Sequence, residues 1–160
     1  YKEIEDMSLA AIEKLNRNGI KCSVLTKGIL PRSLANQSGL NEYGITLITL
    51  DESFRKRMEP GAAPLAARLQ ALRWLHDQGC KTWVSIEPYP TPNIKKQELQ
   101  PLLEAVNFVD KIIFGRMNYS KSVTAYKEHK QFFNKKAMEV VRFCGAHDIN
   151  YHIKSGTIKE

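Results

Sequence analysis

The stretch that decides the fold is residues 43–73, YGITLITLDESFRKRMEPGAAPLAARLQALR. Its apolar and β-branched run at residues 45–50 predicts a strand. A turn at Asp51 leads into a short helical piece at residues 52–57, and Pro64 is well placed as the first residue of a longer helix. Because ligands bind at the carboxyl ends of the strands in parallel α/β proteins, the polar residues that follow this strand are expected to lie at a site.

The rest of the chain repeats this alternation of strand and helix. Further strands are predicted at residues 20–26, 81–86, 109–114 and 149–153, and helices at 2–18, 96–106 and 122–144, with a short helix or loop at 31–40. Gly145 is expected to end the last helix, and Ile4, Met7, Ala11 and Leu15 are expected to fall on one face of the first helix. Regular alternation with short connections predicts one parallel sheet with right-handed crossovers.

Polar residues recur where each predicted strand ends: Lys27, Asp51, Glu87, Arg116 with Asn118, and Lys154. This recurrence favours the mouth of a barrel segment over a one-sided crevice, although five strands are too few for a closed eight-stranded barrel. No GxGxxG or GxxxxGK[ST] sequence follows a strand, so the usual nucleotide-binding motifs are absent.

The composition is that of an ordinary globular domain, with 160 residues, 42% hydrophobic and 26% charged. No apolar run approaches the roughly 20 residues of a membrane span. Cys22, Cys80 and Cys144 are odd in number and far apart, which predicts buried free thiols and a reducing cytoplasm. The net charge is +7, and residues 110–160 hold ten Lys and Arg against five Asp and Glu. This balance permits a nucleic-acid partner, and a solvated basic face explains it equally well.

One ordered set of short sequences resembles the radical S-adenosylmethionine (SAM) superfamily, most closely its spore photoproduct lyase group. The set comprises Leu25-Thr26-Lys27, Thr49-Leu50-Asp51, Glu59-Pro60 with the Pro/Ala-rich turn at 61–64, Arg68-Leu69, GCKTWVSIEPYPTPNI at 79–94, and GRMNY at 115–119. The resemblance runs from about residue 19 to residue 119. It implies a partial parallel (β/α) barrel, a [4Fe–4S] cluster and SAM as cofactors, and radical chemistry carried by the cofactor.

Two motifs of that family are missing from this chain: the Cys-x-x-x-Cys-x-x-Cys that holds the cluster, and the glycine- and acid-containing loop that meets the methionine amino group. The chain also begins inside a predicted helix. We therefore expect a single domain, residues 1–160, that is the carboxyl-terminal part of a radical SAM barrel without the cluster-binding strands, and that is inactive alone. No catalytic or metal-binding residue is assigned.

The resemblance implies six cofactor-side residues. Lys27 would approach the carboxylate of SAM, and Thr46 matches the polar strand position near the ligand. Glu59 and Arg68 would order the loop and helix beside it, while Glu87 and Asn118 at strand ends face the same mouth and could touch cofactor or substrate. From the residues alone, Arg68 could equally pair with Glu59 or hold a carboxylate or phosphate.

Two other functions stay open from the sequence. One is a non-catalytic, degenerate barrel module that binds a protein or nucleic-acid partner. The other is a fragment of an unrelated TIM-barrel phosphate enzyme, for which Ser155-Gly156 is a weak substitute for a glycine-rich loop. An incomplete barrel also exposes edge strands, so a homodimer or a helix covering the edge is expected.

Overall fold

The protein is one parallel sheet with helices between its strands. The computed structural model describes residues 2–117 and 120–158. Its elements, in chain order, are α1 (Lys2–Arg17), β1 (Ser23–Thr26), η1 (Arg32–Asn36), β2 (Glu42–Thr46), α2 (Glu52–Met58), α3 (Leu65–Asp77), β3 (Lys81–Tyr89), α4 (Gln100–Ala105), β4 (Lys111–Arg116), α5 (Lys121–Ala125), α6 (His129–His147) and β5 (Asn150–Ile153).

The strands pair in the order β1-β2-β3-β4-β5, and every pair is parallel. This confirms the predicted α/β class and the segment of a parallel barrel. The two outer strands, β1 and β5, do not pair with each other in the part of the chain that the structure describes, so the sheet is open.

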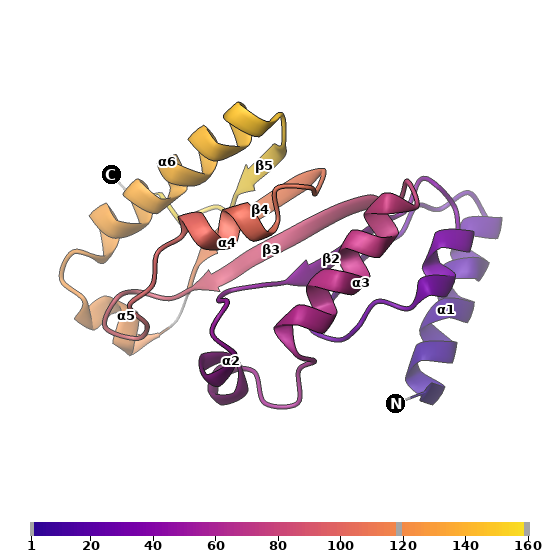
Figure 1. Ribbon diagram of the computed structural model, residues 1–160, viewed down its shortest axis with the longest axis horizontal. Helices are drawn as coiled ribbons and strands as arrows, with labels where there is room; N and C mark the ends of the chain where they lie inside the picture. Colours follow the sequence, from indigo (N-terminus) through magenta and orange to yellow (C-terminus); the bar gives the residue numbers. More distant parts are fainter. Residues whose placement is uncertain (1, 118–119, 159–160) are drawn as a thin grey trace.

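Helices cover one face of the sheet (Figure 1). Helix α3 packs on β2 and β3, and α6 packs on β4 and β5. In register beneath them, Ile45, Val84 and Ile112 are fully buried. Because side chains alternate along a strand, the residues between them point to the opposite face. That opposite face carries Gly44, Trp83 and Lys111, and it forms the pocket described below.

The second strand was predicted at residues 45–50, and this boundary is wrong: β2 is Glu42–Thr46. The apolar run continues past the strand because Leu47 and Ile48 are buried in the loop that leaves the sheet. Gln97 from a distant segment donates its side-chain amide to the Ile48 carbonyl at 2.8 Å. This loop has the apolar composition of a strand because the tertiary structure buries it, so composition alone did not distinguish the two.

The long helix predicted at residues 122–144 is two helices. Tyr126 is extended, with φ −80° and ψ 104°, and it ends α5 before α6 begins at His129. Gly145 lies inside α6 rather than ending it. The helix ends at Asp148, which adopts the left-handed conformation with φ 54°, one that Asp tolerates better than most residues.

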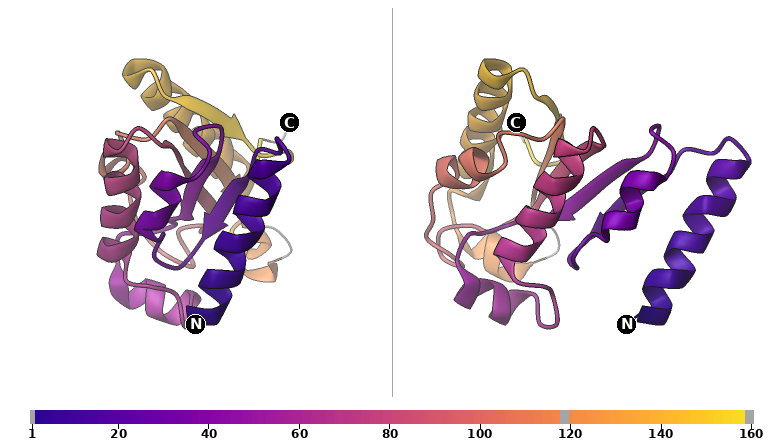
Figure 2. Two further views of the ribbon diagram at one scale, coloured as in Figure 1. Left: turned by 90° about the vertical axis from the view of Figure 1, so that its right-hand side faces the viewer. Right: turned by 45° about the vertical axis from the view of Figure 1, so that its right-hand side comes forward.

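Helix α1 forms as predicted, but its apolar face is not buried. Ile4 and Met7 are 61% and 67% exposed, and Ile12 is the one buried residue of the helix. The right-hand view of Figure 2 shows α1 at the margin of the molecule, away from α6. The periodicity predicted the helix correctly, but it did not determine whether its apolar face is buried. No helix in residues 2–117 or 120–158 combines the length and the apolar character needed to cross a membrane.

Candidate cofactor and substrate site

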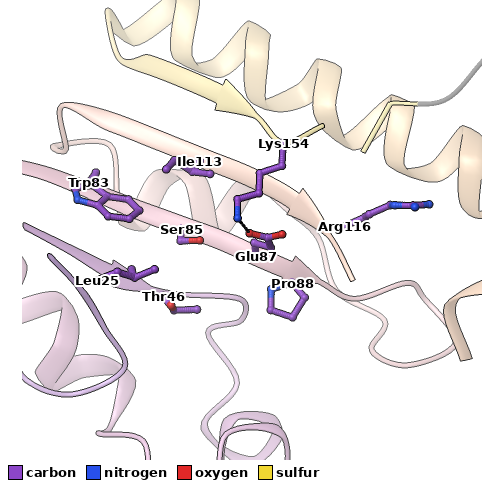
Figure 3. A pocket seen from close by; sticks show the side chains of 9 residues that line it. All are labelled: Leu25, Thr46, Trp83, Ser85, Glu87, Pro88, Ile113, Arg116 and Lys154. Carbon is purple, nitrogen blue, oxygen red and sulfur yellow. Dashed lines mark ion pairs between the residues drawn. The ribbon is translucent and has the colours of Figure 1, made fainter. Parts of the chain in front are cut away.

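The polar residues that follow β1, β2 and β3 lie at one end of the open sheet. A cavity of about 350 Å³ opens there on the face without α3 and α6. Its lining combines apolar, hydroxyl and charged side chains: Leu25, Thr46, Trp83, Ser85, Glu87, Pro88, Ile113, Arg116 and Lys154. This volume and this mixture are typical of small-molecule sites. These side chains come from β1, β2, β3 and β4 and from Lys154, which follows β5 (Figure 3).

A buried ion pair lies on the α3 side of the sheet, next to the end of β2. Arg68 on α3 is fully buried, and its Nη2 donates to Oε2 of Glu59 at 2.9 Å. The other guanidinium nitrogens donate to backbone carbonyls, Nη1 to Thr46 and Nε to Ala63, both at 2.9 Å. Arg68 therefore joins α3, the loop before it and the end of β2. Of the two roles that the sequence left open, the structure shows the pairing with Glu59.

Glu59 presents its second carboxylate oxygen toward Lys27. The side chain of Glu59 is 3% exposed, and its Oε1 accepts no hydrogen bond from the residues described. The Lys27 ammonium lies 3.2 Å from that oxygen as an ion pair, and the Lys27 side chain is 47% exposed. The lysine is therefore held near a buried anion while its solvent side stays accessible to a ligand.

Two hydroxyl groups line the middle of the cavity. Thr46 and Ser85 are direct neighbours in the register of β2 and β3, and both are nearly buried. Since Arg68 holds the Thr46 carbonyl from the opposite side of the sheet, the position of this hydroxyl depends on the buried ion pair. The structure thereby connects Lys27, Thr46, Glu59 and Arg68 in one group.

The charged rim of the cavity is an ion pair between Glu87 and Lys154. Oε2 of Glu87 lies 2.5 Å from Nζ of Lys154, which follows β5 (Figure 3). The carboxylate crosses β4 at Gly115, where an added Cβ would stand 2.9 Å from Glu87 Cδ. Gly115 therefore leaves the space that the Glu87 side chain occupies. Arg116 extends away from this pair in Figure 3.

Trp83 forms the floor of the cavity. Its indole lies against β2 at Gly44, where a Cβ would approach the ring to 2.4 Å. Lys111 reaches past the ring, with Nζ 5.6 Å from the ring centroid, and pairs with Glu42 at 2.9 Å. Hydrogen bonds from Lys21 and Lys111 lower the pKa of Glu42 to about 2. The ion pair between Lys111 and Glu42 lies at the opposite, amino-terminal end of the strands.

Asp51, at the predicted turn, has a structural role. Its carboxylate caps α2 by accepting hydrogen bonds from the backbone of Ser53 and Phe54. A hydrogen bond from Lys95, together with those backbone donors, lowers the pKa of Asp51. With its carboxylate used in this way, Asp51 serves the helix rather than the cavity.

The residues present do not fit an iron–sulfur cluster. Cys22 and Cys144 are buried in different parts of the core, and Cys80 lies before β3, at the amino end of the strand. Within residues 2–117 and 120–158, no three His, Cys, Asp or Glu side chains are placed to hold a metal ion. The accessible Lys27 ammonium and the hydroxyls of the cavity do suit a small ligand that carries a carboxylate.

The structure places Thr46 and Glu87 in the lining of the cavity and links Arg68, Glu59 and Lys27 to the Thr46 backbone through the buried ion pair, while Asn118 lies outside the described residues. The predicted site omitted Trp83 and Ser85, although both share the strand face of Glu87 in the two-residue alternation. It also omitted Lys154, although its place after the last strand was a visible signal.

Comparison with known proteins identifies the relationship of the first two thirds of the chain. The sequence model of the radical SAM superfamily matches residues 1–106. An uncharacterized protein, ORF301 of Acidianus two-tailed virus, is 30% identical over 101 residues, which cover 59% of this chain and 33% of that protein. The chain therefore spans about a third of the length of this curated relative.

Solved structures of similar fold include Streptococcus suis SuiB. SuiB bound to the precursor peptide SuiA matches with a TM-score of 0.61 and 20% identity, over 92% of this chain and 34% of that one. SuiB bound to S-adenosylmethionine matches with a TM-score of 0.60 and 16% identity, over 92% of this chain and 35% of that one. At these identities the likeness concerns the fold.

Proposed function

This chain belongs to the radical SAM superfamily, and on this premise we propose that it supplies the cofactor- and substrate-facing part of a radical S-adenosylmethionine enzyme. The observation that carries the proposal is the cavity at the carboxyl ends of the strands, which combines Thr46 and Glu87 with the adjoining group of Lys27, Glu59 and Arg68. The proposal has a second part: residues 1–160 form one domain, as their single sheet supports, and sequence outside them holds the cluster, since the cysteine triplet is missing from these residues.

The residues of this chain bind and orient rather than react. Lys27 turns from Glu59 toward the carboxylate of SAM, and the ion pair with Glu59 holds the ammonium in place before the ligand binds. Arg68 fixes the backbone of Thr46, whose hydroxyl faces the ligand, and Glu87 contacts cofactor or substrate. Asn118, which lies outside the described residues, stays a proposed contact on the ground of the resemblance alone. In this superfamily the cluster and SAM, when bound, supply the radical chemistry.

A finer assignment, to the spore photoproduct lyase-like group, rests on the ordered short sequences from Leu25 to Tyr119. The basic balance of residues 110–160 supports a nucleic-acid substrate for such an enzyme. In this assignment the phosphates of the substrate meet the lysines of the last third of the chain, and affinity falls as salt is raised.

The test uses the protein that contains this chain, expressed from its full reading frame without oxygen and reconstituted with iron and sulfide. We expect 5′-deoxyadenosine to be released from SAM under reduction. Lys27→Met should raise the KM for SAM by roughly tenfold, because a charge-assisted contact is lost. Lys56→Met, an equal charge change at an exposed position of α2, is the matched control. A protein that neither binds a four-iron cluster nor releases the nucleoside would refute the enzyme assignment.

A further inference from the structure

Lys154 lies outside the residues that match the superfamily, yet it meets the candidate site. The match ends at residue 106, whereas Lys154 follows β5 and lines the same cavity as Thr46 and Glu87. Its Nζ is 2.5 Å from Oε2 of Glu87 (Figure 3). We propose that Lys154 is a positioning residue of this site, which holds the Glu87 carboxylate across β4 so that it faces the ligand. This inference rests on the proposed function.

The backbone of Lys154 is fixed before its side chain reaches the cavity. Its N–H donates to the Phe114 carbonyl at 2.9 Å, which continues the β4–β5 ladder by one residue. Its own carbonyl accepts from the N–H of Thr157 at 3.0 Å, and Thr157 is 1% exposed. A turn anchored by a buried residue thus places the base of the lysine side chain.

The ion pair between Glu87 and Lys154 spans three neighbouring strands. Glu87 is on β3, Gly115 is on β4 and Lys154 follows β5, so the carboxylate must pass over the middle strand. At Gly115 an added Cβ would stand 2.9 Å from Cδ and 3.0 Å from Oε1 of Glu87. Glu87 can therefore adopt this orientation because residue 115 has no side chain.

The ion pair adds little to the stability of the fold, which leaves orientation as its main effect. The Lys154 side chain is 47% exposed, whereas that of Glu87 is 19% exposed. Pairs with one solvated partner are screened by water and contribute little to folding. A carboxylate fixed in direction, however, loses less freedom when it binds a ligand.

The first experiment measures orientation without any ligand. Gly115→Ala should lower the urea midpoint of unfolding, because its methyl group collides with Glu87. If Lys154 holds Glu87 there, the same substitution should lower the midpoint much less in a Lys154→Met background, where Glu87 is free to turn away. If Gly115→Ala lowers the urea midpoint equally with Lys154 and with Lys154→Met, the proposal is overturned. Lys135→Met, at an exposed position of α6, controls for the loss of charge.

The second experiment measures ligand binding through Trp83, which lines the same cavity. Trp74→Phe leaves Trp83 as the single tryptophan, and its fluorescence is followed while S-adenosylmethionine is added. Lys154→Met should weaken binding about tenfold or more, and Lys154→Arg should recover most of that loss. In a Glu87→Gln background Lys154→Met should have no further effect.

The outcomes separate the two proposals. If Lys154→Met weakens S-adenosylmethionine binding just as much in the Glu87→Gln background, Lys154 contacts the ligand itself, and this result would overturn the positioning role. An unchanged affinity in Lys154→Met would overturn it as well. If the Trp74→Phe parent, and the full-length protein, bind no S-adenosylmethionine, the proposed function fails, while the dependence of Gly115→Ala on Lys154 still decides how Glu87 is held.

Discussion

Arg68 joins α3 to the loop before it and to the end of β2. It is fully buried, and it satisfies Glu59 and two backbone carbonyls. Arg68→Met should lower the free energy of unfolding by about 3–5 kcal/mol, because the buried Glu59 carboxylate loses its buried partner and keeps only the half-exposed Lys27 ammonium. Urea denaturation measures this loss. Arg73→Met on the exposed side of the same helix should cost no more than about 1 kcal/mol, from its contact with Phe108; a similar loss for both variants would contradict the role assigned to Arg68.

Glu42 makes stability depend on pH. Its pKa in the folded protein is about 2, lowered from 4.5 chiefly by hydrogen bonds from Lys21 and Lys111. The stabilisation is therefore complete above pH 4.5 and is lost as the pH falls toward 2. Glu42→Gln should cost about 1–2 kcal/mol at pH 7, since both lysines are partly exposed to solvent. Urea titrations at pH 7, 4 and 2.5 should show the gap between wild type and variant closing; a constant gap would contradict this.

The Trp83 ring lies directly on Gly44 and leaves no space for a side chain there. A methyl group there would stand 2.4 Å from Trp83, so Gly44→Ala should destabilise the protein by about 1–3 kcal/mol. The cost should largely vanish in a Trp83→Leu background, which the urea midpoints of the two pairs of variants would show. Gly145→Ala is the matched control: it lies in α6 with open space around its Cβ position, and it should stabilise by about 0.5–1 kcal/mol.

At the scale of the elements, α1 is a helix of which only one side is expected to contribute to stability through burial. Ile12 is 9% exposed, and Ile12→Ala should cost about 2–4 kcal/mol in unfolding free energy. Ile4 is 61% exposed, and Ile4→Ala should change stability by no more than about 0.5 kcal/mol. Equal losses for the two variants would show that the exposed side of α1 is covered in solution.

At the scale of the whole molecule, the open sheet should exchange amide hydrogens unevenly. The central strand β3 is hydrogen-bonded on both sides and carries buried residues from Thr82 to Ile86, whereas β1 and β5 are at the edges. Hydrogen exchange followed by mass spectrometry should find β3 the most protected strand and β1 among the least. Strong protection of β1 would instead favour the dimer through the sheet edge, which stays a prediction and which light scattering would measure.

The sequence by itself determined the class of the fold and its polar end. The alternation of short apolar runs with helical periodicity predicted five parallel strands in chain order, because local patterns record which face of each element is buried. The short sequences around Thr49-Leu50-Asp51 and Glu59-Pro60 led to the radical SAM superfamily. The position of Arg68 early in a helix, close to the loop before it, also offered Glu59 as one of its two possible partners, and the structure shows that pairing.

The tertiary structure alone decided burial, boundaries and pairing across strands. The apolar residues 47–48 lie in a buried loop and α1 exposes most of its apolar side, because burial depends on what packs against a segment and not on its own period. The meeting of Glu87 with Lys154 joins residues 67 positions apart. It requires three parallel strands in register and the missing side chain at Gly115, and no local sequence pattern encodes that distance.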